Sequence, residues 1–304
     1  MIKADNYMYE DIQNILQNGY RDENPRPKYK DGTPAHTYSV NHVMRKYDLS
    51  NGEFPITRLR PIAWKTGIKE ILWVYQDASN NLNYLKEKYK VFYWDEWESK
   101  DYPKTIGKGR YGDVVAEYNL MNELLNSLKN NPYGRRHIID LYQYKGLKES
   151  DGLYPCAFLT IWNVRKSKDN REYLDMCLIQ RSGDMLTASG AGGINEVQYA
   201  ALLMMVARHC GYESGIFTHF VANEHIYDRH KEQANEILNR YEEKILEEIR
   251  SVQDITLTKE KLEQNRPKLI LNPNKTKFYD ITIDDFTMVN YEPIKPQLKL
   301  ELGI

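Results

Sequence analysis

The segment that most constrains the fold of this chain is residues 196–209 (EVQYAALLMMVARH). Its composition predicts a helix that is apolar around every face, and such a helix is buried centrally rather than lying on the surface. Two strand-length runs of β-branched and aromatic residues come before it, at 156–164 (CAFLTIWNV) and 173–181 (YLDMCLIQR). Together these segments favour a single mixed α/β or α+β domain.

The other predicted helices are amphipathic, with apolar residues at helical spacing along one face. They cover residues 7–19, 64–77, 114–129 and 230–266. The last of them is rich in charge, which favours a solvated outer helix over one that binds a partner. Short strands are expected at 268–271 and 279–289. Because no repeat or linker interrupts the chain, we expect one domain over residues 1–304.

Charge and composition exclude several classes of protein. The chain has 42 Lys and Arg against 43 Asp and Glu, so no nucleic-acid partner is expected and any anion site must be local. No apolar run approaches the roughly 20 residues that a membrane span needs, and no N-terminal signal is visible. Three cysteines, Cys156, Cys177 and Cys210, are too few for a disulfide framework or a zinc site. These features predict a reduced, cytoplasmic protein that binds no metal.

The first candidate for chemistry is the cysteine of Leu153-Tyr154-Pro155-Cys156. The segment Gln180-Arg181-Ser182-Gly183-Asp184 begins 24 residues after Cys156, at the end of a second predicted strand. An arginine that reaches the cysteine would lower the pKa of the thiol, and the thiolate is the nucleophilic form. Most lone cysteines in a soluble chain are instead small buried side chains, so this pair of motifs leaves both interpretations open.

Two adjacent arginines, Arg135 and Arg136, follow a turn at Asn131-Pro132-Tyr133-Gly134. Such pairs are usually solvated surface residues. Guanidinium groups also grip phosphate through paired hydrogen bonds. Arg181 and Ser182 could add a further cation and a hydroxyl to the same anion.

Asn195 stands at the start of the apolar helix, where it could simply cap the helix. Its amide could instead pair with the N3–H and O4 of uracil, whereas cytosine presents the reversed pattern. The preceding Ser189-Gly190-Ala191-Gly192-Gly193 lacks the spacing of the known phosphate-binding loops, so it is interpreted as a flexible loop beside the site.

Three further residues have a functional and a structural interpretation. Glu70 lies at the edge of an apolar stripe, where it could relay protons, although most helical glutamates are solvated. His225 and Tyr227 are two residues apart and share a face if the backbone is extended. Their alternative role is to cap or pack against the helix that follows.

These motifs occur in the order seen in thymidylate synthases, and the resemblance covers nearly the whole chain. It rests on the following residues: Asp31-Gly32-Thr33-Pro34-Ala35, Trp73, Tyr93-Trp94-Asp95-Glu96-Trp97, Tyr111-Gly112, Asn131-Pro132, Arg135-Arg136, Tyr154-Pro155-Cys156, Gln180-Arg181-Ser182, Asp184, Asn195, His225-Ile226-Tyr227, His230, Phe278-Tyr279-Asp280 and Asp284-Asp285-Phe286. The resemblance implies an α+β fold with a large twisted sheet packed with helices. One face of that sheet would form the interface of a homodimer with shared active sites.

The resemblance also implies a reaction. Cys156 would attack C6 of dUMP, and 5,10-methylenetetrahydrofolate would supply a one-carbon unit and a hydride, giving dTMP and dihydrofolate. The implied catalytic residues are Cys156, Glu70, Tyr227, Asn195 and Arg181. The implied dUMP ligands are Arg26, Arg135, Arg136, Gln180, Arg181, Ser182, Asp184, Asn195, His225 and Tyr227, with Arg135 and Arg136 supplied by the other subunit. The implied folate contacts are Trp94, Tyr111, Asp184 and the C-terminal Ile304, whose tail would close over the pterin.

The chain departs from the family pattern in three places. Ala157 stands where many members carry histidine, residues 185–194 form a longer loop, and Arg26 is the nearest candidate for an early phosphate arginine. Two rivals on the same scaffold are a dUMP hydroxymethyltransferase, in which water replaces the hydride, and a catalytically silent nucleotide-binding homologue. An intact Trp94 favours the synthase over the first. A hydrolase built on Cys156 and His225 lacks a third partner.

Overall fold

The computed structural model describes residues 2–252 and 265–303, with the side chains of 249–252 left out. Its centre is a seven-stranded sheet in the order β1-β2-β7-β5-β4-β3, with β6 paired to β7 outside this path. The strands are β1 (Tyr20–Arg21), β2 (Thr37–Asp48), β3 (Ile138–Asp140), β4 (Ala157–Lys166), β5 (Glu172–Gln180), β6 (Gly183–Asp184) and β7 (Glu213–Tyr227). Both β5 and β6 run parallel to β7, and the other pairs are antiparallel.

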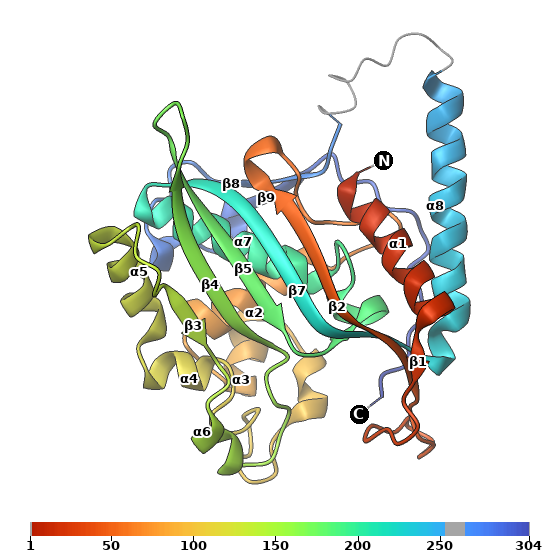
Figure 1. Cartoon of the computed structure of the whole chain (residues 1–304). Helices are drawn as coiled ribbons and strands as arrows, with labels where there is room; N and C mark the ends of the chain where they lie inside the picture. Colours follow the sequence, from red (N-terminus) through yellow and green to blue (C-terminus); the bar gives the residue numbers. More distant parts are fainter. Residues whose placement is uncertain (1, 253–264, 304) are drawn as a thin grey trace.

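The helices pack on one face of this sheet and beside its β2 edge (Figure 1). They are α1 (Lys3–Asn18), α2 (Trp64–Ile71), α3 (Leu82–Tyr84), α4 (Gly112–Glu117), α5 (Leu120–Asn130), α6 (Tyr144–Lys148), α7 (Ile194–Cys210) and α8 (Lys231–Val252). A separate two-stranded sheet pairs β8 (Lys268–Leu271) with β9 (Phe286–Val289). The predicted α+β class, with a large sheet packed with helices, is confirmed.

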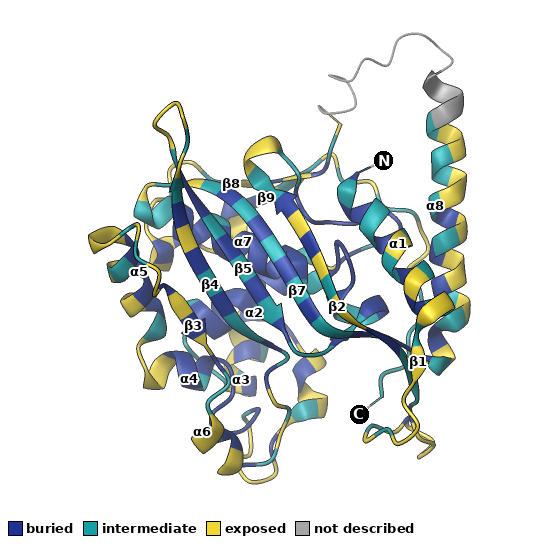
Figure 2. Cartoon of the chain, in the orientation of Figure 1, coloured by how far each residue is buried: buried dark blue, intermediate teal, exposed yellow. Residues whose placement is uncertain are grey.

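The predicted all-apolar helix is α7, and it occupies the centre of the core. Val197, Leu202 and Met205 have no exposed surface, and α7 packs between α2 and the strands β5 and β7. In Figure 2 no described helix covers the opposite face of the sheet, where buried and partly exposed residues alternate along the strands. One face of the sheet is therefore core and the other is open in this single chain.

Two predicted elements were wrong in detail. The helix expected at 114–129 is two helices, because Asn119 adopts a left-handed conformation (φ 50°) between α4 and α5. The strand expected at 279–289 is limited to β9, since Thr282 and Asp285 cap a 3-10 turn just before it. The charged helix expected at 230–266 is α8 as far as Val252, and residues 253–264 lie outside the described part of the chain.

Candidate active site

The strand order brings the predicted site residues to one edge of the sheet. Since β4 is antiparallel to β5 and β5 is parallel to β7, the start of β4 lies beside the ends of β5 and β7. Cys156 directly precedes β4, and Arg181 directly follows β5. Asp184 pairs with His225 where β6 meets β7. The site is thus made from segments that are distant in sequence.

Arg181 is held against Cys156 by the backbone before the cysteine. Its Nε donates to the carbonyl of Pro155 (3.0 Å), and its Nη2 donates to the carbonyl of Tyr154 (2.9 Å). The same Nη2 lies 3.5 Å from Cys156 Sγ. On the other side, the hydroxyl oxygen of Tyr111 accepts from the backbone N–H of Cys156 (3.0 Å). The cysteine therefore has a fixed position and a fixed cationic neighbour.

The protonation state of Cys156 differs from the sequence-based expectation. Burial raises the pKa of the thiol above its ordinary value, and the guanidinium groups of Arg181 and Arg26 only partly offset that effect. The cations act in the predicted direction, but desolvation is the larger influence. The resting thiol is therefore protonated at neutral pH: the expected effect of the arginine is present, but burial outweighs it in the ligand-free protein.

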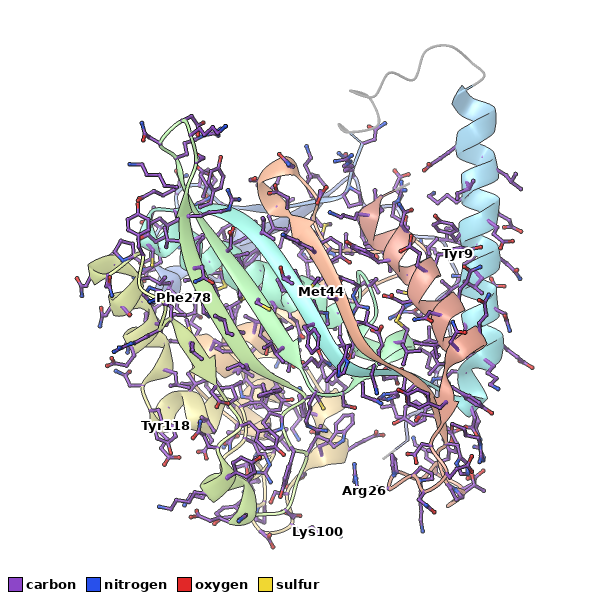
Figure 3. All side chains as sticks on the ribbon, viewed as in Figure 1. Tyr9, Arg26, Met44, Lys100, Tyr118 and Phe278 are labelled. Atoms are coloured by element: carbon purple, nitrogen blue, oxygen red, sulfur yellow. The ribbon has the colours of Figure 1, made fainter. Side chains whose placement is uncertain are left out.

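Arg26 lies close enough to the site to act on two of its residues. Its charge opposes the raised pKa of Cys156 and also that of Tyr227. Figure 3 shows Arg26 below the lower ends of the central strands, separate from the bulk of the protein. Arg26 is exposed, and within the described residues its side chain has no ion-pair partner. An unpaired, accessible arginine at this edge is suited to binding an anion.

Glu70, at the end of α2, carries a raised pKa. Burial raises the pKa of this carboxyl to about 7, although Trp94 and Gln198 direct polar hydrogens toward it. The Nε1 of Trp94 and the Nε2 of Gln198 are buried, and neither makes a hydrogen bond of normal geometry within the described residues. A carboxyl that titrates near neutrality, facing two spare donors, is suited to proton transfer through ordered water.

Asn195 is not the cap of α7, because Gly193 occupies that position. Its Nδ2 donates to Gln198 Oε1 (2.8 Å), and its Oδ1 accepts from Ser189 Oγ (3.2 Å). Gln180 Nε2 lies farther from the same oxygen, at 3.4 Å. The capping interpretation is therefore wrong. The amide is only partly buried, so one N–H is free for a ligand, and the long bond from Gln180 is the one that a ligand would displace at the oxygen.

His225 and Tyr227 share one face of β7, and their rings pack edge to face with centroids 5.5 Å apart. Burial, assisted by the charge of Asp184, raises the pKa of Tyr227 to about 12. Burial also lowers the pKa of His225, and Asp184 opposes that shift. Both groups are therefore neutral at physiological pH and available for hydrogen bonding. Ser182 lies between β5 and β6 at the same edge and is partly exposed.

The predicted folate side is an aromatic wall around Trp94. The ring of Trp94 packs against Trp97 (5.5 Å), Tyr111 (5.6 Å) and Trp73 (6.2 Å between centroids). Ile304, the predicted closing residue, lies outside the described residues. The segment before it reaches the site, since an added Cβ at Gly303 would lie 2.8 Å from Cε1 of Tyr227.

Arg135 and Arg136 are not brought to this edge within one chain. Ile138 pairs with Ile161, so Arg136 lies beside the middle of β4, about six residues beyond its start. At roughly 3.3 Å per residue, that places it ~20 Å along the strand from Cys156. Both arginines are exposed and lack an ion-pair partner among the described residues.

Sequence reasoning missed the side chains that support the site. They are Arg45, Gln198, His219 and Glu224, and all are buried. The available signal was the presence of charged and polar residues inside otherwise apolar helix and strand segments.

The Gly-rich loop was expected to be flexible, but residues 189–193 are buried. Two hydrogen bonds hold this loop: Arg45 Nη2 donates to the carbonyl of Ser189 (2.7 Å), and the Gly192 N–H donates to Glu196 (2.6 Å).

The described residues contain no helix long and apolar enough to cross a membrane. They also contain no group of three or more His, Cys, Asp or Glu side chains arranged to hold a metal ion.

Comparisons with known proteins agree with this geometry. A sequence model of the family described as Thymidylate synthase matches residues 6–304. The thymidylate synthases of Lactococcus lactis subsp. cremoris (strain SK11) and Streptococcus pneumoniae (strain 70585) are each 48% identical over 305 residues, covering 100% of both chains. The solved structure of thermostable thymidylate synthase A from Bacillus subtilis superposes with a TM-score of 0.81 at 33% identity, covering 99% of each chain. The chain therefore belongs to the thymidylate synthase family.

Proposed function

We propose that this protein converts dUMP to dTMP and uses 5,10-methylenetetrahydrofolate as the cosubstrate, which leaves as dihydrofolate. The observation that carries the proposal is the Cys156 thiol, held 3.5 Å from the guanidinium of Arg181. Gln180, which precedes Arg181, reaches Asn195, and Tyr111 is close to both Cys156 and Glu70. A nucleophile, a cation, an amide that can read a base and a carboxyl of pKa about 7 are the groups that this reaction needs.

The phosphate of dUMP would bind between Arg26 and Arg181. The two guanidinium groups both act on Cys156, so they lie around the same space. Ser182 directly follows Arg181 and adds a hydroxyl donor. His225 and Tyr227, neutral and on one face of β7, would bind the ribose 3′-hydroxyl. Asp184 pairs with His225 across β6 and β7, so it is close enough to contribute to both the nucleotide and the folate sides of the site.

The base would pair with the free N–H and lone pair of Asn195, which match O4 and N3–H of uracil. Cys156 then forms a bond to C6, and the electron pair of the C5–C6 bond moves toward O4. The thiol proton passes to ordered water as this bond forms, because the resting thiol is protonated. Arg181 stabilises the thiolate as it forms. Glu70, with ordered water, is placed to exchange protons with the O4 side of the base.

The aromatic wall fits the cosubstrate. Trp94 is 7% exposed, and its unpaired Nε1 faces Glu70 at the inner end of the wall. The bound folate supplies the one-carbon unit and the hydride at C5. Tyr227, with ordered water, is placed to take the C5 proton. Trp94 and Tyr111 exclude bulk water, which disfavours the hydroxymethylating alternative in which water attacks the C5 methylene.

We further propose that two copies of the chain pair through the open sheet face. Two rows of side chains cross that face in register: Met44, Phe220, Ile179 and Leu159, and then Lys46, Thr218, Cys177, Ile161 and Ile138. Met44 is 63% exposed and Ile138 is 48% exposed, and Figure 3 shows Met44 on this face. A broad apolar sheet face without a cover is typical of a protein interface.

Such a dimer would also account for the two remote arginines. Arg135 and Arg136 lie ~20 Å from their own Cys156 along the strand direction, so they can serve only a site that a second copy brings near.

The proposed location is the cytoplasm, which is supported by the three free cysteines, since a reducing compartment keeps thiols unpaired.

The proposal is tested by substituting Cys156 with alanine. Turnover should fall by at least roughly 10³-fold, because no other group on the sheet edge replaces the nucleophile. Binding of dUMP should largely survive, since the phosphate and base contacts remain. The matched control is Cys210→Ala, because Cys210 ends α7 and takes no part in the site. Substantial turnover by Cys156→Ala would refute the covalent mechanism.

A further inference from the structure

A largely buried charged cluster lies behind the proposed base-reading residue. Arg45, on β2, has no exposed surface and donates to Glu196 (2.7 Å), to Asp11 (2.7 Å) and to Glu224 (2.8 Å). Burying an arginine among three carboxylates costs more free energy than an apolar core of the same volume. The reaction proposed above uses none of these four groups directly.

The cluster connects to Asn195 through a continuous series of hydrogen bonds. Arg45 Nη2 lies 3.2 Å from His219 Nδ1, and His219 Nε2 lies 3.0 Å from Gln180 Oε1. Gln180 Nε2 donates to Ser189 Oγ at 2.7 Å. Ser189 Oγ in turn donates to Asn195 Oδ1 at 3.2 Å. His219, Gln180 and Ser189 are all at least 98% buried, since none is more than 2% exposed.

The direction of this series is fixed at two points. The guanidinium of Arg45 has no acceptor, so it can only donate. Gln180 Nε2 also donates to the backbone carbonyl of Ser182 (3.0 Å), and a carbonyl can only accept. The oxygen of the Gln180 amide must therefore face His219, whose Nε2 must carry a hydrogen. This holds whether His219 Nδ1 accepts from Arg45 or donates to Glu196, which lies 3.1 Å away.

The same direction continues through Asn195. Its Oδ1 receives a hydrogen bond from Ser189, so its Nδ2 faces the other way and donates to Gln198 Oε1 (2.8 Å). The Nε2 of Gln198 is then directed toward Glu70. A flip of the Asn195 amide would place its Nδ2 against another donor, the Nε2 of Gln180, which donates to Asn195 Oδ1 at 3.4 Å. It would also set two acceptors against each other at Gln198, and the Ser189 hydroxyl would have to turn in order to accept.

We propose that Arg45, His219 and Ser189 are positioning residues that lock the Asn195 amide in the orientation that fits uracil and rejects cytosine. A flipped asparagine amide would present its donor and acceptor in the order that cytosine needs. The selectivity for the base is therefore set by the buried cluster, and the unusual loop 189–193 is what carries Ser189 into the series. This inference rests on the proposed function and extends it to residues that do not touch the substrate.

Four variants test the inference, with kcat/KM for dUMP divided by kcat/KM for dCMP as the readout. Ser189→Ala removes the shorter of the two hydrogen bonds that Asn195 Oδ1 accepts, and His219→Leu removes the ring that joins Arg45 to Gln180. Each should lower the ratio by about tenfold, the effect of losing one buried hydrogen bond. His219→Gln retains an acceptor for Arg45 and a donor for Gln180, so it should restore most of the ratio.

The matched control is Tyr47→Phe. The Tyr47 hydroxyl donates to Glu196 Oε2 (2.7 Å) in the same buried cluster but is no part of the series that reaches Asn195. This variant should lose thermal stability and keep the ratio. A merely structural role for His219 or Ser189 would give the same result as the control.

The outcomes separate the two proposals. A wild-type protein that turns over neither nucleotide in the presence of the folate would overturn the proposed function itself. A wild type that prefers dUMP, together with a folded Ser189→Ala variant that keeps the same ratio, would overturn the positioning role alone. Ser189→Ala removes a single oxygen atom, so it decides the question even if His219→Leu fails to fold.

Discussion

At the scale of single residues, the carboxyl of Glu70 predicts a specific pH dependence. Its pKa is raised to about 7 by burial, so the profile of kcat/KM should show an ionisation near pH 7. Glu70→Gln should remove that step and lower kcat roughly 10²- to 10⁴-fold. Steady-state rates between pH 5 and 9, roughly two units on each side of the step, check this. If the variant still showed an ionisation near pH 7, that ionisation would belong to a group other than Glu70.

The same pKa also predicts an effect on stability. A carboxyl whose folded pKa lies above its ordinary value of 4.5 stabilises the fold most below pH 4.5, and that contribution is lost as the pH rises through about 7. Glu70→Gln cannot titrate, so its melting temperature relative to wild type should increase from pH 5 to pH 8. Glu87→Gln, at an exposed position, is the control and should show no such trend.

The residues that could be predicted from sequence are those whose chemistry is visible locally. Cys156 behind Pro155 and the arginine of Gln180-Arg181-Ser182 form short motifs of that kind. The pKa of the thiol could not be predicted, because burial depends on the folded surroundings. The proposed role of His219 was hidden for the same reason, since His219 reaches Gln180 only because β5 pairs with β7. The proposed role of Ser189 depends likewise on the folded path of residues 189–193.

At the scale of elements, the start of α7 depends on Gly192. This residue has φ +64°, and an added Cβ would lie 2.2 Å from the backbone nitrogen of Thr57. Gly192→Ala should therefore destabilise the protein by roughly 2–5 kcal/mol and displace Asn195. Gly211, after the other end of α7, also has a positive φ (+84°) but meets no atom within 4 Å. Gly211→Ala should cost only about 1–2 kcal/mol.

Chemical denaturation of both glycine variants measures the two free energies. Equal losses at Gly192 and Gly211 would show that backbone conformation alone matters at these positions. In that case the close approach of Gly192 to Thr57 would contribute nothing to the placement of Asn195.

Long, strongly patterned elements were predictable, and their interruptions were not. The apolar helix and the strands at 156–164 and 173–181 were found close to their true bounds, as α7, β4 and β5. The break at Asn119 depends on one residue adopting a left-handed conformation, which hydrophobic spacing does not report. The 3-10 turn capped by Thr282 and Asp285 is a local exception of the same kind.

At the scale of the whole molecule, the proposed dimer predicts complementation between two inactive chains. Cys156→Ala and Arg136→Ala should each be strongly impaired alone. After subunit exchange, half of the dimers are mixed, and one of their two sites has both an intact cysteine and an intact arginine. Activity should therefore return to about a quarter of the wild-type value. No recovery, despite exchange shown by native mass spectrometry, would mean that Arg136 does not act across the interface.

The fold of a single chain was predictable because its motifs follow the family order, whereas its assembly was only implied. The open sheet face combines residues from β2, β3, β4, β5 and β7, so no single segment of sequence reveals it. The distance of Arg136 from Cys156 likewise follows from strand register rather than from the spacing of the two residues in the chain.

The central claim is that the protein transfers both a one-carbon unit and a hydride to C5 of dUMP. Incubation of the purified protein with dUMP and 5,10-methylenetetrahydrofolate, followed by mass identification of both products, tests it most directly. We expect dTMP and dihydrofolate in equal amounts, because the wall around Trp94 and Tyr111 keeps water from the C5 methylene until the hydride arrives. Hydroxymethyl-dUMP with tetrahydrofolate, or no nucleotide product at all, would contradict the account.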